Sequence, residues 1–146
     1  NKKTNSYGRF VASSTATYLN EYTFTRTPGG VLPNFVDRDG LPRFRIQTRL
    51  DWALKEYGAG ITSNYIPEYG DIDLDGFRTT SYSTYNAYVS YQFSSKVLMA
   101  GTKITVGMDN VLDEEPPLYA DSVGYDNSLA GRPQGRFAFI TLKREF

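Results

Sequence analysis

The sequence contains no cysteine and no histidine. The lack of cysteine excludes a disulfide framework and thiol chemistry. The lack of histidine removes the commonest general base and, with it, the Ser-His and Cys-His nucleophile pairs. The 16 basic and 16 acidic side chains give a net charge of zero, so the charge balance does not indicate nucleic acid or an acidic partner.

Long apolar runs are also missing, and none approaches the roughly 18 residues that a membrane helix needs. The mean hydropathy is −0.46. Aromatic residues are nevertheless abundant, with 12 Tyr, 9 Phe and 1 Trp. A polar average with many aromatics suits a water-soluble protein, but it also suits a membrane β-barrel, because half of the strand residues in a barrel face its lumen.

A period of two runs through most of the chain and predicts strands with two different faces. No segment has a convincing helical period. We therefore predict an all-β fold of antiparallel, up-and-down strands, in six segments: Tyr7–Phe24, Arg43–Lys55, Gly58–Glu68, Tyr82–Phe93, Thr102–Asp109 and Gly135–Phe146.

The connections between these segments alternate between long and short. Residues 25–42, 69–81 and 111–134 are long, whereas a tight turn near Glu56–Tyr57 and residues 94–101 are short. In an up-and-down sheet every long connection then lies at one end, as in outer-membrane barrels. Strand alternation alone would also fit a half-buried soluble sheet. The sorted connections favour a transmembrane β-barrel.

The last segment ends on Phe146 without a polar tail. In a closed barrel the final strand is paired along its length, since unpaired backbone groups in lipid cost several kcal/mol each. Such a strand can end flush with the sheet. If the long connections are extracellular, the last strand runs away from them, and Phe146 lies at the periplasmic rim. Arg144 interrupts the apolar positions of this segment, and near the interface a cation costs only about 0–1 kcal/mol.

Two stretches near the C-terminus carry a more specific pattern. In "VGMDNVLDEEPPLY" the strand runs into Asn110, Val111, Leu112 and Asp113, followed by Pro116 and Pro117; "GRF" then supplies Gly135, Arg136 and Phe137 before the final strand. This pattern resembles the C-terminal end of TonB-dependent outer-membrane receptors, closely over about the last 45 residues and loosely over the rest. Leu112 departs from the family, which more often has Phe there.

The resemblance implies a barrel of about 22 strands around an N-terminal plug. This sequence holds about six strands and no plug, and it starts at Asn1 without Met or a signal peptide, so we expect the C-terminal part of a larger receptor. Such a receptor is integral to the outer membrane of a Gram-negative bacterium and binds a scarce ligand outside the cell. It admits that ligand when the TonB-ExbB-ExbD complex acts on the N-terminal part.

The resemblance also implies no enzymatic activity, no catalytic residues and no cofactor. The ligand class stays open between a siderophore, a cobalamin and a saccharide. The other implied partners are outer-membrane lipid and the barrel-assembly machinery, with Ile140, Leu142 and Phe146 as the assembly signal. In such a barrel several charged side chains would face the lumen and bond to the plug or to one another across strands: Arg45, Arg49, Asp51, Lys55, Lys103, Asp109 and Lys143.

A possible calcium loop lies in "DIDLDG", where Asp71, Asp73 and Asp75 alternate before a glycine. Such carboxylates can converge on one hard cation, but Tyr82 occupies the position at which the calcium loop carries a bidentate Glu. A solvated acidic loop is the competing interpretation. Candidate ligand contacts in the extracellular connections are Phe35, Phe77, Tyr119 and Tyr125, although aromatic residues at loop bases also simply mark the membrane interface.

Two other functions remain open at this point. One is a complete small outer-membrane barrel with a structural or adhesive role. The other is a soluble all-β glycan-binding module. Sequence upstream of Asn1 separates the first from a receptor, and solubility without detergent separates the second.

Overall fold

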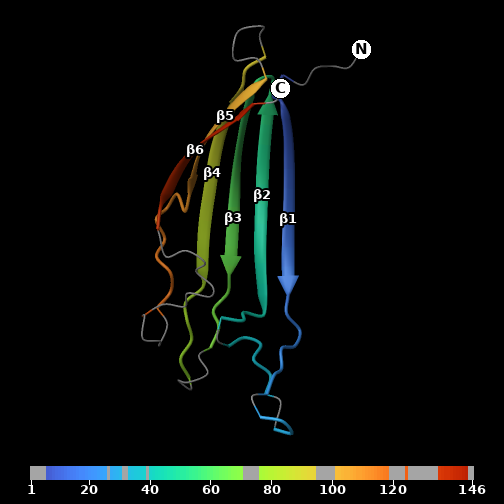
Figure 1. The fold of residues 1–146 in the computed structure, drawn as a ribbon, viewed down its shortest axis with the longest axis vertical. Helices are drawn as coiled ribbons and strands as arrows, with labels where there is room; N and C mark the ends of the chain where they lie inside the picture. The colour runs from blue at the N-terminus through green and yellow to red at the C-terminus, as the bar shows by residue number, and fades with distance from the viewer. Residues whose placement is uncertain are drawn as a thin grey trace.

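The computed structural model describes residues 6–25, 27–30, 33–38, 40–70, 76–94, 101–118, 124 and 135–144. Within these ranges the fold is all-β, with six strands: β1 (Arg9–Tyr18), β2 (Phe44–Leu54), β3 (Tyr57–Ile66), β4 (Tyr82–Gln92), β5 (Thr102–Asp109) and β6 (Phe137–Arg144). They form one antiparallel sheet in chain order, which confirms the up-and-down prediction (Figure 1). β1 and β6 are the two edges, and the sheet is not closed. None of the described residues forms a helix with the length and hydropathy of a membrane span.

The strand register places the apolar positions of all six strands on one side of the sheet, which we call the apolar face. One continuous row crosses the whole sheet through directly paired residues: Phe10, Trp52, Ala59, Val89, Val106 and Ile140. The next row is Ala12, Leu50, Ile61, Ala87, Met108 and Ala138. A register slip of one residue in any strand would turn its side chains to the opposite side, so the agreement of six strands confirms the predicted two-faced pattern.

The opposite side, which we call the polar face, carries hydroxyl, amide and charged groups. One of its rows is Arg9, Ala53, Gly58, Ser90, Thr105 and Thr141. Another places Lys103 between Gln92 and Lys143. The two faces of the sheet therefore differ in chemistry over its full width.

The apolar face has no covering layer among the described residues. Ile140 is 76% exposed, Leu142 65% and Val89 60%. The buried apolar residues in the described part are Phe35, Val36 and Tyr69, and all three lie in connections and not in the sheet. The sheet thus lacks the second layer that a soluble domain uses to bury such a face.

The connections are sorted as the sequence predicts. Residues 19–43, 67–81 and 110–136 join strands at one end of the sheet, and residues 55–56 and 93–101 join strands at the other (Figure 1). β1 begins and β6 ends at the short-connection end. We refer to the opposite end as the long-connection end.

Several strand boundaries differ from the predicted ones, most of all in the first segment. β1 ends at Tyr18 and not at Phe24, because its partner β2 is preceded by Pro42. The amide of Leu19 donates to the carbonyl of Arg43 at 2.8 Å. Proline has no N–H with which to continue the ladder, so residues 20–24 enter the connection.

The other boundary shifts are smaller. β3 begins at Tyr57 and stops at Ile66, before Pro67, because a residue that precedes proline is restricted and proline cannot donate to the ladder. The tight turn is Lys55–Glu56 and not Glu56–Tyr57, with Lys55 at a φ of 53°. β2 and β4 are each slightly shorter than predicted, and β5 agrees residue for residue. β6 spans Phe137–Arg144, while Glu145 and Phe146 lie outside the described residues.

Candidate functional site

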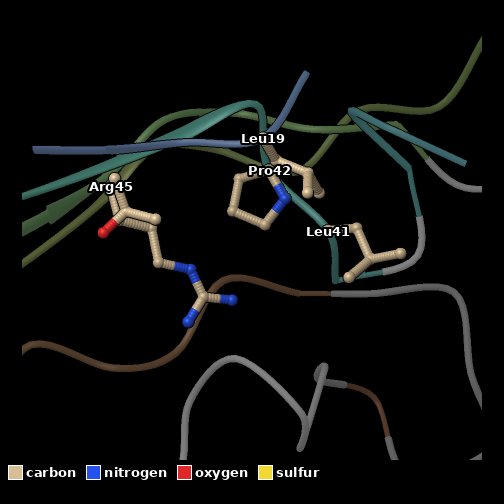
Figure 2. A pocket seen from close by; sticks show the side chains of 5 residues that line it. Leu19, Leu41, Pro42 and Arg45 are labelled. Atoms are coloured by element: carbon tan, nitrogen blue, oxygen red, sulfur yellow. The ribbon is translucent and has the colours of Figure 1, made fainter. Parts of the chain in front are cut away.

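An open hollow lies on the polar face at the long-connection end, over β1, β2 and β3. Its volume is about 370 Å³. The polar side chains that line it belong to Thr15, Thr17, Arg45, Gln47 and Asn64. It continues toward the connection as a second depression that shares Thr17 and Arg45 with it and is also lined by Leu19, Leu41 and Pro42. Figure 2 shows Arg45 extending away from its strand on the same side as Leu41 and Pro42.

Arg45 is the cation of this hollow. Its Nη2 donates to the carbonyl oxygen of Gly40 at 3.4 Å, a long hydrogen bond. Arg49 and Arg78, by contrast, each form an ion pair with a carboxylate, Asp51 and Asp37 respectively. No carboxylate of the described residues lies within ion-pair distance of Arg45. Its guanidinium keeps most of its five donors available.

Amide and hydroxyl side chains form a ladder across the floor of the hollow. Gln47 donates from Nε2 to Oδ1 of Asn64 at 2.8 Å, and Asn64 donates from Nδ2 to the hydroxyl oxygen of Thr84 at 3.3 Å. Thr15 is the cross-strand partner of Gln47. These mutual bonds fix the amides in orientation and still leave donor and acceptor capacity for another molecule.

A second polar cluster lies nearer the middle of the same face. Arg49 donates to Asp51 from Nε at 2.6 Å and from Nη2 at 2.9 Å, and the hydroxyl of Tyr88 donates to Oδ1 of Asp51 at 2.6 Å. The sequence predicts ion pairs across strands, whereas this pair joins two residues of one strand. Tyr88 supplies the cross-strand contact, reaching over β3 from β4.

A glycine in β3 allows the Tyr88 side chain to reach Asp51 across that strand. Gly60 lies between Asp51 and Tyr88 in the register, and a Cβ at this position would collide with the Tyr88 ring. The ring of Phe139 covers Gly107 in the same way. Both aromatic side chains therefore lie flat against the polar face and narrow the space that it presents.

At the long-connection end, a backbone hydrogen bond and an ion pair join the first two long connections. These connections hold three buried apolar residues, which we call the connection core: Phe35, Val36 and Tyr69. Tyr69 is 0% exposed. Phe35 stacks on Phe24 with ring centroids 4.5 Å apart. Backbone bonds hold the two connections together, with the amide of Gly70 donating to the carbonyl of Asp37 at 2.8 Å.

Arg78 links the same two connections through charge. It contacts Asp37 at 3.1 Å and Glu68 at 3.2 Å. The hydrogen bond that Arg78 donates to Asp37 raises the pKa of Arg78 above its ordinary value, so this side chain stays cationic at any working pH. Arg78 therefore adds an ion-pair link to the backbone link between the two connections.

The motif at the end of β5 forms a closed turn. Asn110 donates from Nδ2 to the carbonyl of Glu114 at 2.8 Å and accepts from the Glu114 amide at 3.0 Å. Asn110 and Asp113 have φ values of 49° and 59°. Asn and Asp are the non-glycine residues that tolerate this left-handed region best, so the residue types of the motif follow from the turn.

The two halves of the motif meet in space. Oδ1 of Asp113 accepts a hydrogen bond of 2.7 Å from the Arg136 amide, and Gly135, at a φ of 59°, passes close enough that a Cβ would crowd the same oxygen. The motif thus joins the end of β5 to the start of β6. Pro116 and Pro117 are half-buried in the outgoing chain, and Leu112 is exposed. Within the described residues, the role of the motif is structural.

The candidate ligand-contact residues are not gathered at one place. Phe35 is buried at 9% exposure in the connection core, and Phe77 is half-buried in the connection from β3 to β4. Tyr119 and Tyr125 lie outside the described residues, as do Asp71, Asp73 and Asp75 of the possible calcium loop. Within the part that the structure describes, no group of three acidic side chains is placed to hold a metal ion.

The sequence analysis names Arg45 as a candidate lumen residue but does not single out four other polar residues of the hollow: Thr15, Thr17, Gln47 and Asn64. They differ in no obvious way from other polar residues of their strands. Their position near the strand ends that face the long connections is the one signal in the sequence that could have drawn attention to them. Comparison with protein-family models, with curated proteins and with solved structures finds no match to this chain.

Proposed function

We propose that this chain is the C-terminal portion of the β-barrel of a TonB-dependent outer-membrane receptor, which takes up a scarce ligand with energy from the TonB-ExbB-ExbD complex. In this proposal the apolar face contacts lipid and the polar face lines the lumen. The long-connection end is extracellular. The C-terminus is periplasmic, and β1 and β6 pair with strands of a larger barrel.

The observation that carries the proposal is the apolar face. A continuous row from Phe10 to Ile140 crosses all six strands and stays uncovered by any described residue. A soluble sheet buries such a face against a second layer, whereas a barrel in a membrane leaves it to hydrocarbon.

The height of this face fits a membrane. Aromatic residues flank it at both ends, with Tyr18, Phe44 and Tyr65 at the long-connection end and Tyr57 and Tyr91 at the other. β2 has 11 residues, which span about 33 Å at a rise of about 3.3 Å each. At a tilt of about 40° this length covers about 25 Å, the height of the lipid-facing band of such barrels.

One pair of polar side chains on the apolar face is joined by its own hydrogen bond. Ser14 and Thr48 face each other across β1 and β2, and their hydroxyl oxygens are 3.1 Å apart in a mutual hydrogen bond. A hydroxyl bonded to its neighbour avoids most of the cost of leaving water. The pair is therefore compatible with contact to lipid.

Cell fractionation tests the proposal and separates it from the alternatives. An antibody against the extracellular connection at residues 33–38 would follow the native protein through density-gradient separation of the membranes. The receptor predicts a signal in the outer membrane, at a mass well above 16.5 kDa, that resists extraction with urea. A complete small barrel predicts the same fraction at the mass of this chain, and a glycan-binding module predicts the soluble fraction.

A second arm of the same experiment addresses transport. Outer-membrane vesicles and whole cells would be compared for ligand accumulation with and without a protonophore, using mixtures of siderophores, cobalamins and saccharides. Accumulation that requires both the protein and the proton gradient supports the receptor. Accumulation that is unchanged by the protonophore contradicts it.

A further inference from the structure

We propose that the hollow over β1, β2 and β3 binds the carboxylate-bearing end of an acidic saccharide. This inference rests on the proposed function, because it takes the polar face to be the surface along which the ligand travels. It narrows the ligand class to a sugar that carries both an anionic group and several free hydroxyls.

The cation gives the first requirement on the ligand. Arg45 has no carboxylate partner among the described residues and bonds only weakly to the backbone of Gly40. A guanidinium presents a planar fork of donors that matches a carboxylate in a two-point contact. A neutral ligand would leave that fork unmatched.

The neutral polar groups give the second requirement. Thr15 and Thr17 offer hydroxyls, and Gln47 and Asn64 offer amides that are already held in orientation by their mutual bond. Hydroxyl and amide groups both donate and accept. Sugar hydroxyls have the same dual capacity, whereas an isolated inorganic anion would use the acceptor role alone and leave the amide ladder without a partner.

The far side of the hollow gives the third requirement. Leu19, Leu41 and Pro42 form an apolar wall beside Arg45 (Figure 2). A pyranose ring has a C–H face that can pack on such a surface, with its hydroxyls directed to the strands. Among the described residues, no acidic side chain that would repel an anion lines either part of the hollow.

Calorimetric titration of the purified whole protein in detergent tests this inference with two matched probes. The first is a galacturonic acid trisaccharide, and the second is its methyl ester, in which a neutral –COOCH₃ group replaces each carboxylate and the ring hydroxyls are unchanged. We expect the acid to bind at least tenfold more tightly than the ester. Equal binding, or no binding of either, would overturn the inference.

Variants locate the binding. Arg45→Gln should weaken binding of the acid by about ten- to a hundredfold and leave the ester unchanged, since a charged hydrogen-bonded pair is lost. Lys103→Gln removes one positive charge from the opposite end of the same face and should change neither affinity by more than about twofold. If both variants weaken the acid equally, the effect is general attraction and the hollow is not the site.

The hydroxyl groups are tested separately by Thr17→Val, which keeps the side-chain shape. We expect about a fivefold loss for both probes, because this hydroxyl would contact sugar and not the carboxylate. An unchanged affinity for both would contradict the assignment of the hollow. The fractionation experiment reports independently on the membrane location. A protein found in the outer membrane that shows no preference for the acid would contradict this inference alone. A soluble protein that prefers the acid would contradict the receptor proposal alone.

Discussion

The sheet and the connections at its long-connection end treat their apolar residues in opposite ways. In the sheet, side chains such as Val89 and Ile140 stay 60% and 76% exposed on one uncovered face. In the connections, Phe35, Val36 and Tyr69 are each buried. The connections therefore contain the buried apolar residues, and the strands carry an exposed apolar surface whose contact with water is unfavourable.

This difference is the one that the proposed membrane location predicts for the two regions. Residues 33–38 and 67–70 pack, pair backbone groups and form ion pairs, as a water-exposed element does. Between its two edge strands the sheet pairs its backbone through the ladder, and none of the described residues forms a layer over its apolar side chains. In the proposed receptor, hydrocarbon would cover this face between its aromatic borders.

The largest effect is expected in the connection core. Tyr69→Ala removes a fully buried aromatic ring, and such changes cost about 3–5 kcal/mol. Because the core lies outside the sheet, the loss should open the connections locally. Hydrogen exchange at the Gly70 amide, which is bonded to Asp37, should accelerate by orders of magnitude while exchange in β2 and β3 stays slow.

Leu118→Ala is the matched control, because Leu118 lies in another long connection and is 78% exposed. It should leave exchange at Gly70 unchanged. Global unfolding of the sheet by Tyr69→Ala would show that the two regions are one cooperative unit. That result would contradict the separation of the sheet from the connections.

The next effect tests the solvent of the sheet. Val106→Arg places a cation on the apolar face, at a cost of about 2–4 kcal/mol if that face lies at mid-membrane depth. Thr105→Arg adds the same side chain one residue away on the polar face and should cost less than about 1 kcal/mol. The free energy of unfolding in lipid vesicles, measured by urea titration, should separate the two, and equal costs would contradict contact with lipid.

The turn between β5 and the last long connection should give a smaller effect. Asn110→Ala removes both hydrogen bonds to Glu114 and places alanine at a positive φ, for a loss of about 2 kcal/mol. Denaturant midpoints would measure it. Leu112→Ala, at a side chain that is 64% exposed, should shift the midpoint little, and a larger shift there than at Asn110 would reverse the assigned roles.

The smallest effect lies at the short-connection end. Lys55 adopts a φ of 53° in the turn between β2 and β3. Lys55→Gly should therefore stabilise the protein by about 0.5–1 kcal/mol, since glycine adopts that conformation without strain. Glu56→Gly, at a position without positive φ, should destabilise it by a similar amount. The two denaturant midpoints should move in opposite directions.

The sequence predicts the sheet much better than the connections. Alternation locates all six strands, and β5 agrees residue for residue, because a period of two is a local property. The first strand was overextended because its length depends on Pro42 in the partner strand, which is not a local signal. The same limit applies to Lys55, where the turn was placed one residue too late.

The connection core and the hollow could not be predicted, because both depend on contacts between distant and irregular segments. Nothing near Tyr69 in the sequence indicates that it is buried, and the interpretation of Phe35 as a candidate ligand contact does not predict the burial of that ring. The motif residues were selected by resemblance. Their physical role became visible only when Asp113 was found beside Gly135 and Arg136.

Site-directed spin labelling tests the central claim most directly, because the sequence has no cysteine of its own to interfere. Single labels at Val89, Val106 and Ile140 would be compared with labels at their sequence neighbours Ser90, Thr105 and Thr141, in the native protein reconstituted in lipid. The account predicts that the first set collides with oxygen dissolved in the bilayer and the second with a water-soluble nickel complex, in strict alternation along each strand. Labels of the first set that meet the nickel complex, or that are immobilised beneath another layer of protein, would contradict it.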